Sequence, residues 1–138
     1  MKNLMKRLKD QRGLTLIELL AVVVILGIIA AIAVPSIGGI ISKTEKDAQV
    51  AEGLQIINAA KMYTSVHKVK DNDTLTKTEL ATYLDNIKDD GFTVKIDVNS
   101  GTGKFTYSIT SHSSVSLVDG KDNTTKDSVA TEKELLSY

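Results

Sequence analysis

The sequence predicts an α+β fold. One long N-terminal helix, membrane-spanning in its first half, is expected to carry a small antiparallel β-sheet head. Three observations predict this: a long, almost entirely apolar run at residues 14–41, a helical apolar period at residues 42–66, and alternating apolar residues after Gly91. With 138 residues, one small folded unit is expected beside the apolar segment.

Residues 1–13 form a basic leader, in which five basic residues and one acidic residue give a net charge of +4. The rest of the chain carries −4, so the whole is neutral. Positive charge before an apolar run favours a cytoplasmic N-terminus and an exported C-terminal part. Because no strongly basic surface remains in the exported part, the sequence does not indicate nucleic-acid binding.

The apolar run at residues 14–41 is long enough to cross a membrane. As a helix it would measure about 42 Å, and about 20 residues suffice to cross the hydrocarbon core. It is longer than the apolar core of a secretory signal, which has about 7–15 residues. Hydropathy alone therefore predicts a single-pass anchor, in a helix that also contains Glu18.

Glu18 is out of place in a plain anchor, because a carboxylate facing lipid at depth costs about 2.5–3.5 kcal/mol. The acid follows a basic leader and a glycine in the stretch "RGLTLIELL". This pattern, over roughly residues 7–45, resembles the N-terminus of type IV prepilins and pseudopilins. Leu14 departs from the family, which usually has phenylalanine at that position.

The resemblance implies that a prepilin peptidase and methyltransferase cuts after Gly13 and methylates the new N-terminal residue, Leu14. Glu18 of one subunit would then meet the Leu14 amine of a neighbour, and the pair would fix the axial register of packed helices. The alternative is that Glu18 lies at the membrane interface and extends toward the headgroups.

A kink is expected near residues 31–35, because Pro35 removes a backbone donor and clashes with the preceding turn. Gly38 and Gly39 weaken the helix by roughly 1 kcal/mol each. The resemblance implies that a filament can loosen the helix around Pro35, and a static kink is the alternative.

Residues 42–66 predict the amphipathic half of the same helix, ending at about Val66. Gln55, Asn58 and Ser65 lie on its polar side. The apolar side is where the head should pack, and its members are Val50, Leu54, Ile56, Ile57, Ala60 and Tyr63.

The head, residues 67–138, should contain a short helix and about three antiparallel strands. A polar loop at residues 67–74 precedes a capping box at Thr76–Glu79, which predicts a helix at about residues 77–87. A second box at Thr131–Glu134 predicts a last helical turn. Alternation predicts strands at residues 92–98, 105–109 and 115–118, and the short connections favour a meander.

No residue set in the sequence indicates an enzyme or a bound cofactor. The chain has no cysteine, so disulfides and thiol chemistry are excluded. His67 and His112 both fall in predicted loops and are expected to be solvated. Serines surround His112, but no acid in the sequence is placed to complete a catalytic triad.

Two acidic loops carry oxygen ligands of the kind that calcium prefers. Asp71 and Asp73 alternate, but the following residues do not fit a calcium-binding loop. Asp119, Asp122, Asn123 and Asp127 are weak candidates, and the resemblance adds support because some pseudopilins bind calcium in a late loop. A solvated loop is the favoured interpretation of both.

The sequence thus predicts a structural subunit of a type IV pilus or pseudopilus, serving DNA uptake, adhesion, motility or secretion. Expected partners are further copies of itself, the prepilin peptidase, a membrane assembly platform, minor pilins, and membrane lipid before assembly. The precursor would sit in the cytoplasmic membrane with its head outside, before joining an extracellular or cell-wall-spanning filament. The alternative is an uncleaved, membrane-anchored binding or sensor domain.

Overall fold

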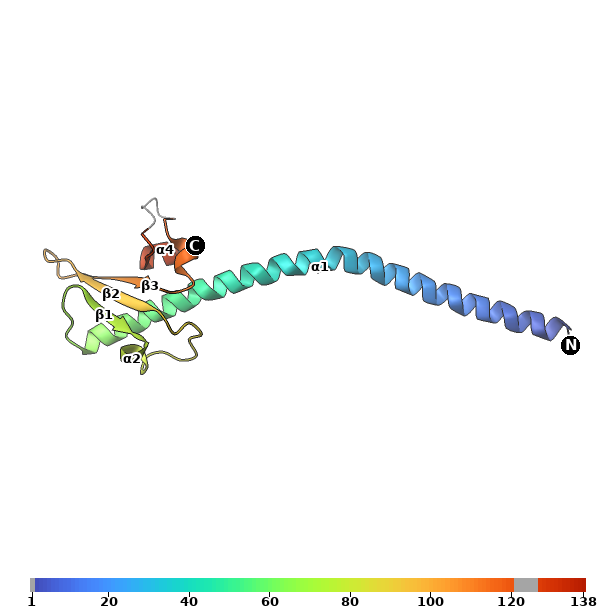
Figure 1. Cartoon of the computed structure of the whole chain (residues 1–138), viewed down its shortest axis with the longest axis horizontal. Coiled ribbons are helices and arrows are strands. Elements are labelled where there is room, and N and C mark those ends of the chain that lie inside the picture. The colour runs from blue at the N-terminus through green and yellow to red at the C-terminus, as the bar shows by residue number, and fades with distance from the viewer. Residues whose placement is uncertain (1, 121–126) are drawn as a thin grey trace. The chain divides into compact units, whose positions relative to one another are not determined.

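The computed structural model describes residues 2–120 and 127–138, with side chains described from Thr15 onward. The fold divides into two compact units, residues 1–43 and 44–138. Helix α1, Lys2–Val66, contributes to both, and every other element belongs to the second unit (Figure 1). The helix ends at Val66, as the periodicity predicted.

The second unit contains a four-stranded antiparallel sheet with the order β1-β2-β3-β4. Each strand therefore pairs with its neighbours in the chain, which confirms the predicted meander. The strands are β1 Asp73–Thr76, β2 Thr93–Val98, β3 Phe105–Thr110 and β4 Ala130–Thr131.

The core of this unit lies between one face of the sheet and the second half of α1. Val94 stands opposite Ile109 and Ile96 opposite Tyr107, and all four side chains are buried. They form one cluster with the apolar side of α1, namely Val50, Ile56, Ile57 and Ala60. The predicted packing of the sheet on this helix is confirmed.

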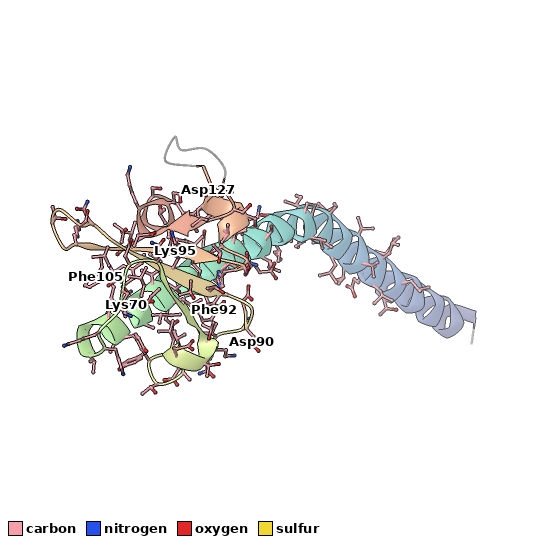
Figure 2. All side chains as sticks on the ribbon, turned by 60° about the vertical axis from the view of Figure 1, so that its left-hand side comes forward. Lys70, Asp90, Phe92, Lys95, Phe105 and Asp127 are labelled. Carbon is pink, nitrogen blue, oxygen red and sulfur yellow. The ribbon has the colours of Figure 1, made fainter. Side chains whose placement is uncertain are left out.

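The other face of the sheet is polar, as alternation along the strands requires. Lys95, which Figure 2 labels, lies on that face of β2. It forms an ion pair with Asp97 of the same strand, with an N–O distance of 2.7 Å. Phe92, just before β2, is almost completely buried.

Three short helices complete the unit: α2 Lys77–Leu80, α3 Val115–Val118 and α4 Glu132–Leu136. Both predicted capping boxes are present, at the starts of α2 and α4. Helix α2 is shorter than the predicted 77–87. The backbone amides of Lys88 and Asp89 donate to the Glu52 carboxylate of α1, at 2.6 and 3.3 Å, and this holds the following segment as a loop.

Two predictions about strands were wrong. Residues 115–118, predicted as a strand, form α3, whose amides bond back to the preceding turn. The predicted polar loop at residues 67–74 gives way at Asp73 to β1, in which only Leu75 is buried. A strand with one face in the core buries at most every second residue. The four residues of β1 therefore contain too few apolar side chains for alternation to be recognised in the sequence.

Candidate assembly surface

The first half of α1 exposes a continuous apolar surface. Every large aliphatic side chain between Leu16 and Ile41 is more than half exposed, and Ile32 reaches 72%. Fully burying one such side chain is worth about 1.5–3 kcal/mol. This segment therefore requires lipid or other protein surfaces around it.

The same segment is long and apolar enough to cross a membrane. Within the described residues, the one helix that meets this criterion is Thr15–Val66, and none of its most apolar stretch is buried in the fold. This property follows from the length and composition of the helix, which the sequence already shows.

Glu18 lies in the apolar surface and is exposed. None of the ion pairs among the described side chains includes it. The backbone is helical through Gly13 and Leu14, whose side chains lie outside the described ones. Because Leu14 and Glu18 are four residues apart on a helix, they share one face.

The glycines of the segment face open space. A Cβ added at Gly27, Gly38 or Gly39 would meet no atom of the described residues within 4 Å. Packing inside the chain therefore does not explain them, whereas close approach by a second helix would use them. Helix α1 continues through Pro35 without a break in its helical assignment.

Comparison with known proteins points to the same segment. Residues 8–34 match the family model described as the prokaryotic N-terminal methylation motif. This segment of the chain therefore carries a prokaryotic N-terminal methylation motif. The predicted resemblance is thereby confirmed for this region.

The relatives that match are type II secretion and fimbrial proteins. The type II secretion system core protein G of Vibrio cholerae is 41% identical over 59 residues, which is 43% of this chain and 40% of that protein. The type IV major fimbrial protein FimA of Dichelobacter nodosus is 39% identical over 72 residues, which is 52% of this chain and 42% of that protein. The chain thus spans about two fifths of these relatives. No solved structure matches it significantly.

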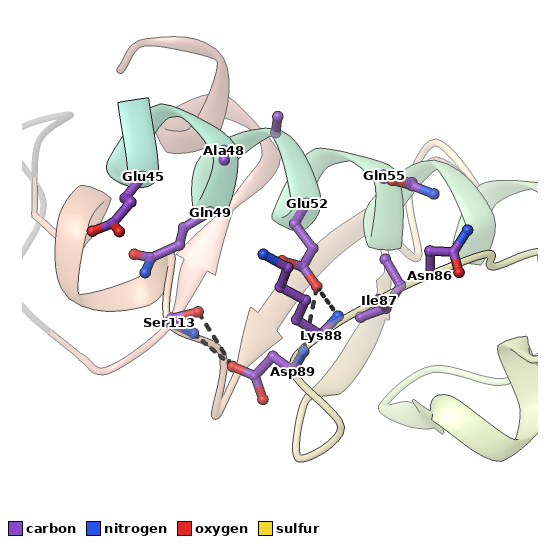
Figure 3. Close-up of a pocket in the computed structure, with 11 residues that line it drawn as sticks. Glu45, Ala48, Gln49, Glu52, Gln55, Asn86, Ile87, Lys88, Asp89 and Ser113 are labelled. Atoms are coloured by element: carbon purple, nitrogen blue, oxygen red, sulfur yellow. Dashed lines mark hydrogen bonds between the residues drawn. The ribbon is translucent and has the colours of Figure 1, made fainter. Parts of the chain in front are cut away.

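Beyond this pilin-type segment, the second unit has a groove of about 640 Å³ beside α1. Figure 3 shows acidic and amide side chains around it, from α1 and from the loop before β2. Asp89 joins the loop before β2 to the turn after β3, since its carboxylate accepts from the Gly91 amide of its own loop at 3.2 Å and from the Ser113 amide of that turn at 3.0 Å. Burial raises the pKa of Asp89, but these bonds and the His112 charge outweigh it, so the pKa is lowered.

His112 was predicted to be solvated, and that prediction was wrong. Its side chain is only 5% exposed, and its ring contacts Phe92 edge-on. Burial follows from the turn after β3, which Asp89 holds through Ser113. His67 is exposed, as predicted, and stacks on Tyr63.

The weak calcium candidates divide into described and undescribed residues. The Asp119 carboxylate accepts hydrogen bonds from the backbone amides of Asp127 and Ser128, at 3.1 and 3.2 Å. These bonds connect Asp119 to residues 127–128. Asp122 and Asn123 lie outside the described residues. Among the residues that are described, no three His, Cys, Asp or Glu side chains are placed to hold a metal ion.

Proposed function

We propose that this chain is the structural subunit of a type IV pilus-like filament. The observation that carries the proposal is the apolar surface of residues 15–41, which contains an acid and is left exposed by the described residues. Lipid would cover this surface before assembly, and the helices of further copies would cover it afterwards.

The proposed precursor loses residues 1–13. Cutting after Gly13 by a prepilin peptidase would free the amine of Leu14, which the same enzyme would methylate. The matched methylation motif spans both residues and supports this step. Residues 14–41 would then be the membrane and assembly half of the helix, residues 42–66 its amphipathic half, and residues 67–138 the head.

Glu18 is proposed to pair with the Leu14 amine of an adjacent subunit. Two charges that are each costly in a low-dielectric surrounding become tolerable as a pair. A purely aliphatic helix surface would tolerate sliding, whereas the ion pair selects one axial position.

The region of Pro35, Gly38 and Gly39 is proposed as the place where α1 bends or loosens during packing. Pro35 has no backbone donor, and the open space beside both glycines leaves room for a neighbour. An assembly platform in the membrane and minor pilins are further proposed partners. The positive charge of residues 1–13 favours their cytoplasmic placement, with the head outside.

Replacing Glu18 by alanine tests this function directly. We expect E18A to insert in the membrane at the wild-type level and to give much less sheared filament, because the register-setting charge is lost. Mass spectrometry of wild-type filaments should find Leu14 as the first residue, carrying a methyl group on its amine.

Glu45→Ala is the matched control, since Glu45 is an exposed acid on the same helix outside the apolar run. It should leave filament yield unchanged. Normal polymerisation of E18A would overturn the charge-pair role. Functional protein that retains Met1–Gly13 would instead support an uncleaved membrane-anchored domain.

A further inference from the structure

The turn between β3 and α3 is built around a buried histidine. Ser111 adopts a positive φ of 57°, a conformation that non-glycine residues rarely occupy. It directs the chain so that His112 and Ser114 are both buried, at 5% and 0% exposure. Helix α3 starts immediately afterwards, at Val115.

The hydrogen bonds of His112 define its protonation state. Its Nδ1 accepts from the backbone amide of Ser114 at 3.1 Å and lies 2.7 Å from the Ser114 hydroxyl. A backbone amide can only donate, so Nδ1 carries no proton and the neutral ring carries its proton on Nε2. That Nε2 is buried and has no hydrogen-bond partner among the described residues.

Protonation of this ring, which adds a second proton to it, would be energetically unfavourable. The added proton would have to go on Nδ1, where it would face the Ser114 amide and break that bond. The Ser114 hydroxyl oxygen, 2.7 Å away, could accept from Nδ1–H, but the positive ring would keep an unpartnered buried donor at Nε2, which is unfavourable.

Acidic groups surround the ring but are already bonded elsewhere. Glu52 on α1 and Asp89 before β2 bond to backbone amides of neighbouring loops. Asp119 and Asp127 line the hollow beside the ring, and none of the lysines or arginines among residues 15–120 and 127–138 lines it. Burial lowers the pKa of His112 below its ordinary value of 6.5, and the charges of Asp89 and Glu52 oppose this without cancelling it.

The same turn also positions α3 against α1. Ser114 packs against the backbone of Gly53, where an added Cβ would lie 2.7 Å from the hydroxyl oxygen. Val115 and Val118 of α3 are buried in the same core as Val50 of α1. A change at His112 would therefore reach the contact between residues 111–118 and the helix.

We propose that His112 is an acid-sensitive lock, which holds residues 111–118 on α1 while its ring is neutral and releases them when the ring is protonated. The proposal does not depend on filament formation, because every group in it belongs to the second unit. It assigns to this turn a conformational response to mildly acidic surroundings.

The sign of the pH dependence follows from the lowered pKa. A histidine that binds its proton less readily in the folded chain than in the unfolded chain stabilises the fold fully above the unfolded value. This stabilisation is lost as the pH falls below about 6.5. Reference pKa values of carboxyl groups are about 4, so most of the proton uptake between about pH 7.5 and about pH 5 falls on the histidines.

Amide hydrogen exchange of the full chain in detergent micelles tests the lock. We expect the protection of residues 112–118, corrected for intrinsic exchange, to fall severalfold between about pH 7.5 and about pH 5. Protection of β2 and β3 should change much less. Equal protection of residues 112–118 at both pH values would overturn the proposal, and this measurement needs no variant.

The chain has two histidines, so His67→Gln is a matched control for His112→Gln. The melting temperature of wild type and H67Q should fall over the same pH range, and that of H112Q should fall much less. Because glutamine can accept the Ser114 amide bond, H112Q is expected to fold. An acid response that disappears in H67Q and persists in H112Q would assign it to His67 and contradict the lock.

Discussion

Glu134 shows how one charged residue can organise the end of the chain. Its side chain is 2% exposed, although glutamate is rarely buried. The carboxylate accepts from the Thr131 amide at 2.8 Å and from the Gly120 amide at 3.1 Å. It thus caps α4 and ties that helix to the end of α3.

Truncating Glu134 to alanine should lower the free energy of unfolding by about 1–3 kcal/mol, because two partly buried amides lose a charged acceptor. Glu132→Ala is the control on the same helix. Glu132 pairs with Lys61, but both side chains are about one third exposed, so its loss should cost about 0–1 kcal/mol. Denaturant unfolding measures both, and equal costs would contradict this role for Glu134.

His112 shows where residue-level prediction fails. Serines on both sides of it indicate a solvated loop, and nothing local predicts burial. The groups that bury it come from distant places in the chain: Asp89 reaches Ser113, and Phe92 covers the ring. By contrast, Glu18 could be identified from the sequence, because an acidic residue among apolar sequence neighbours is unusual.

At the scale of elements, the strongly periodic segments were predictable and the short ones were not. The end of α1 and strands β2 and β3 follow from the apolar spacing. The four residues of α3, Val-Ser-Leu-Val, alternate like a strand but are too few to distinguish strand from helix. Capping chemistry succeeded where alternation failed, since both predicted boxes start helices.

The contact between α1 and the turn before α3 depends on a missing side chain at Gly53. In an exposed helix, alanine would be favoured over glycine by roughly 1 kcal/mol. Here a Cβ would also lie 3.2 Å from Leu135 Cδ2, in addition to its clash with Ser114. Overpacking of this kind typically costs about 1–3 kcal/mol, so the steric term should exceed the helix preference.

Gly53→Ala should therefore destabilise the second unit by about 1 kcal/mol. The reason can be isolated with Ser114→Ala, which removes the closest atom. In a double-mutant cycle, G53A should cost less in the S114A background than in the wild type. Thermal unfolding of the four proteins provides the values, and a stabilising G53A would show that helix preference decides at this position.

At the scale of the whole molecule, the two units differ in whether their apolar side chains are buried. Residues 16–41 leave them on the surface. The second unit gathers its own into one cluster, in which the first member along the chain is Val50. The boundary between the two units, at Lys43 and Thr44, lies between the exposed apolar segment and the first residue of the buried cluster.

A fragment of residues 44–138 should therefore fold alone, remain monomeric in water and retain its sheet. It keeps every member of the core cluster and leaves out the exposed apolar run. The full chain should need detergent or membranes under the same conditions, because its aliphatic side chains would otherwise drive association. Circular dichroism and light scattering after size exclusion measure both properties.

A shorter fragment, residues 54–138, supplies the control for that experiment. It loses Val50 from the core and the Glu52 carboxylate that holds the loop before β2. Truncating one buried aliphatic residue typically costs about 2–5 kcal/mol, which is a large part of the stability of a small domain. The longer fragment should thus melt cooperatively, and the shorter one at a much lower temperature or not at all. An unfolded longer fragment would mean that residues before Thr44 contribute to folding, against the independence of the second unit argued from its core.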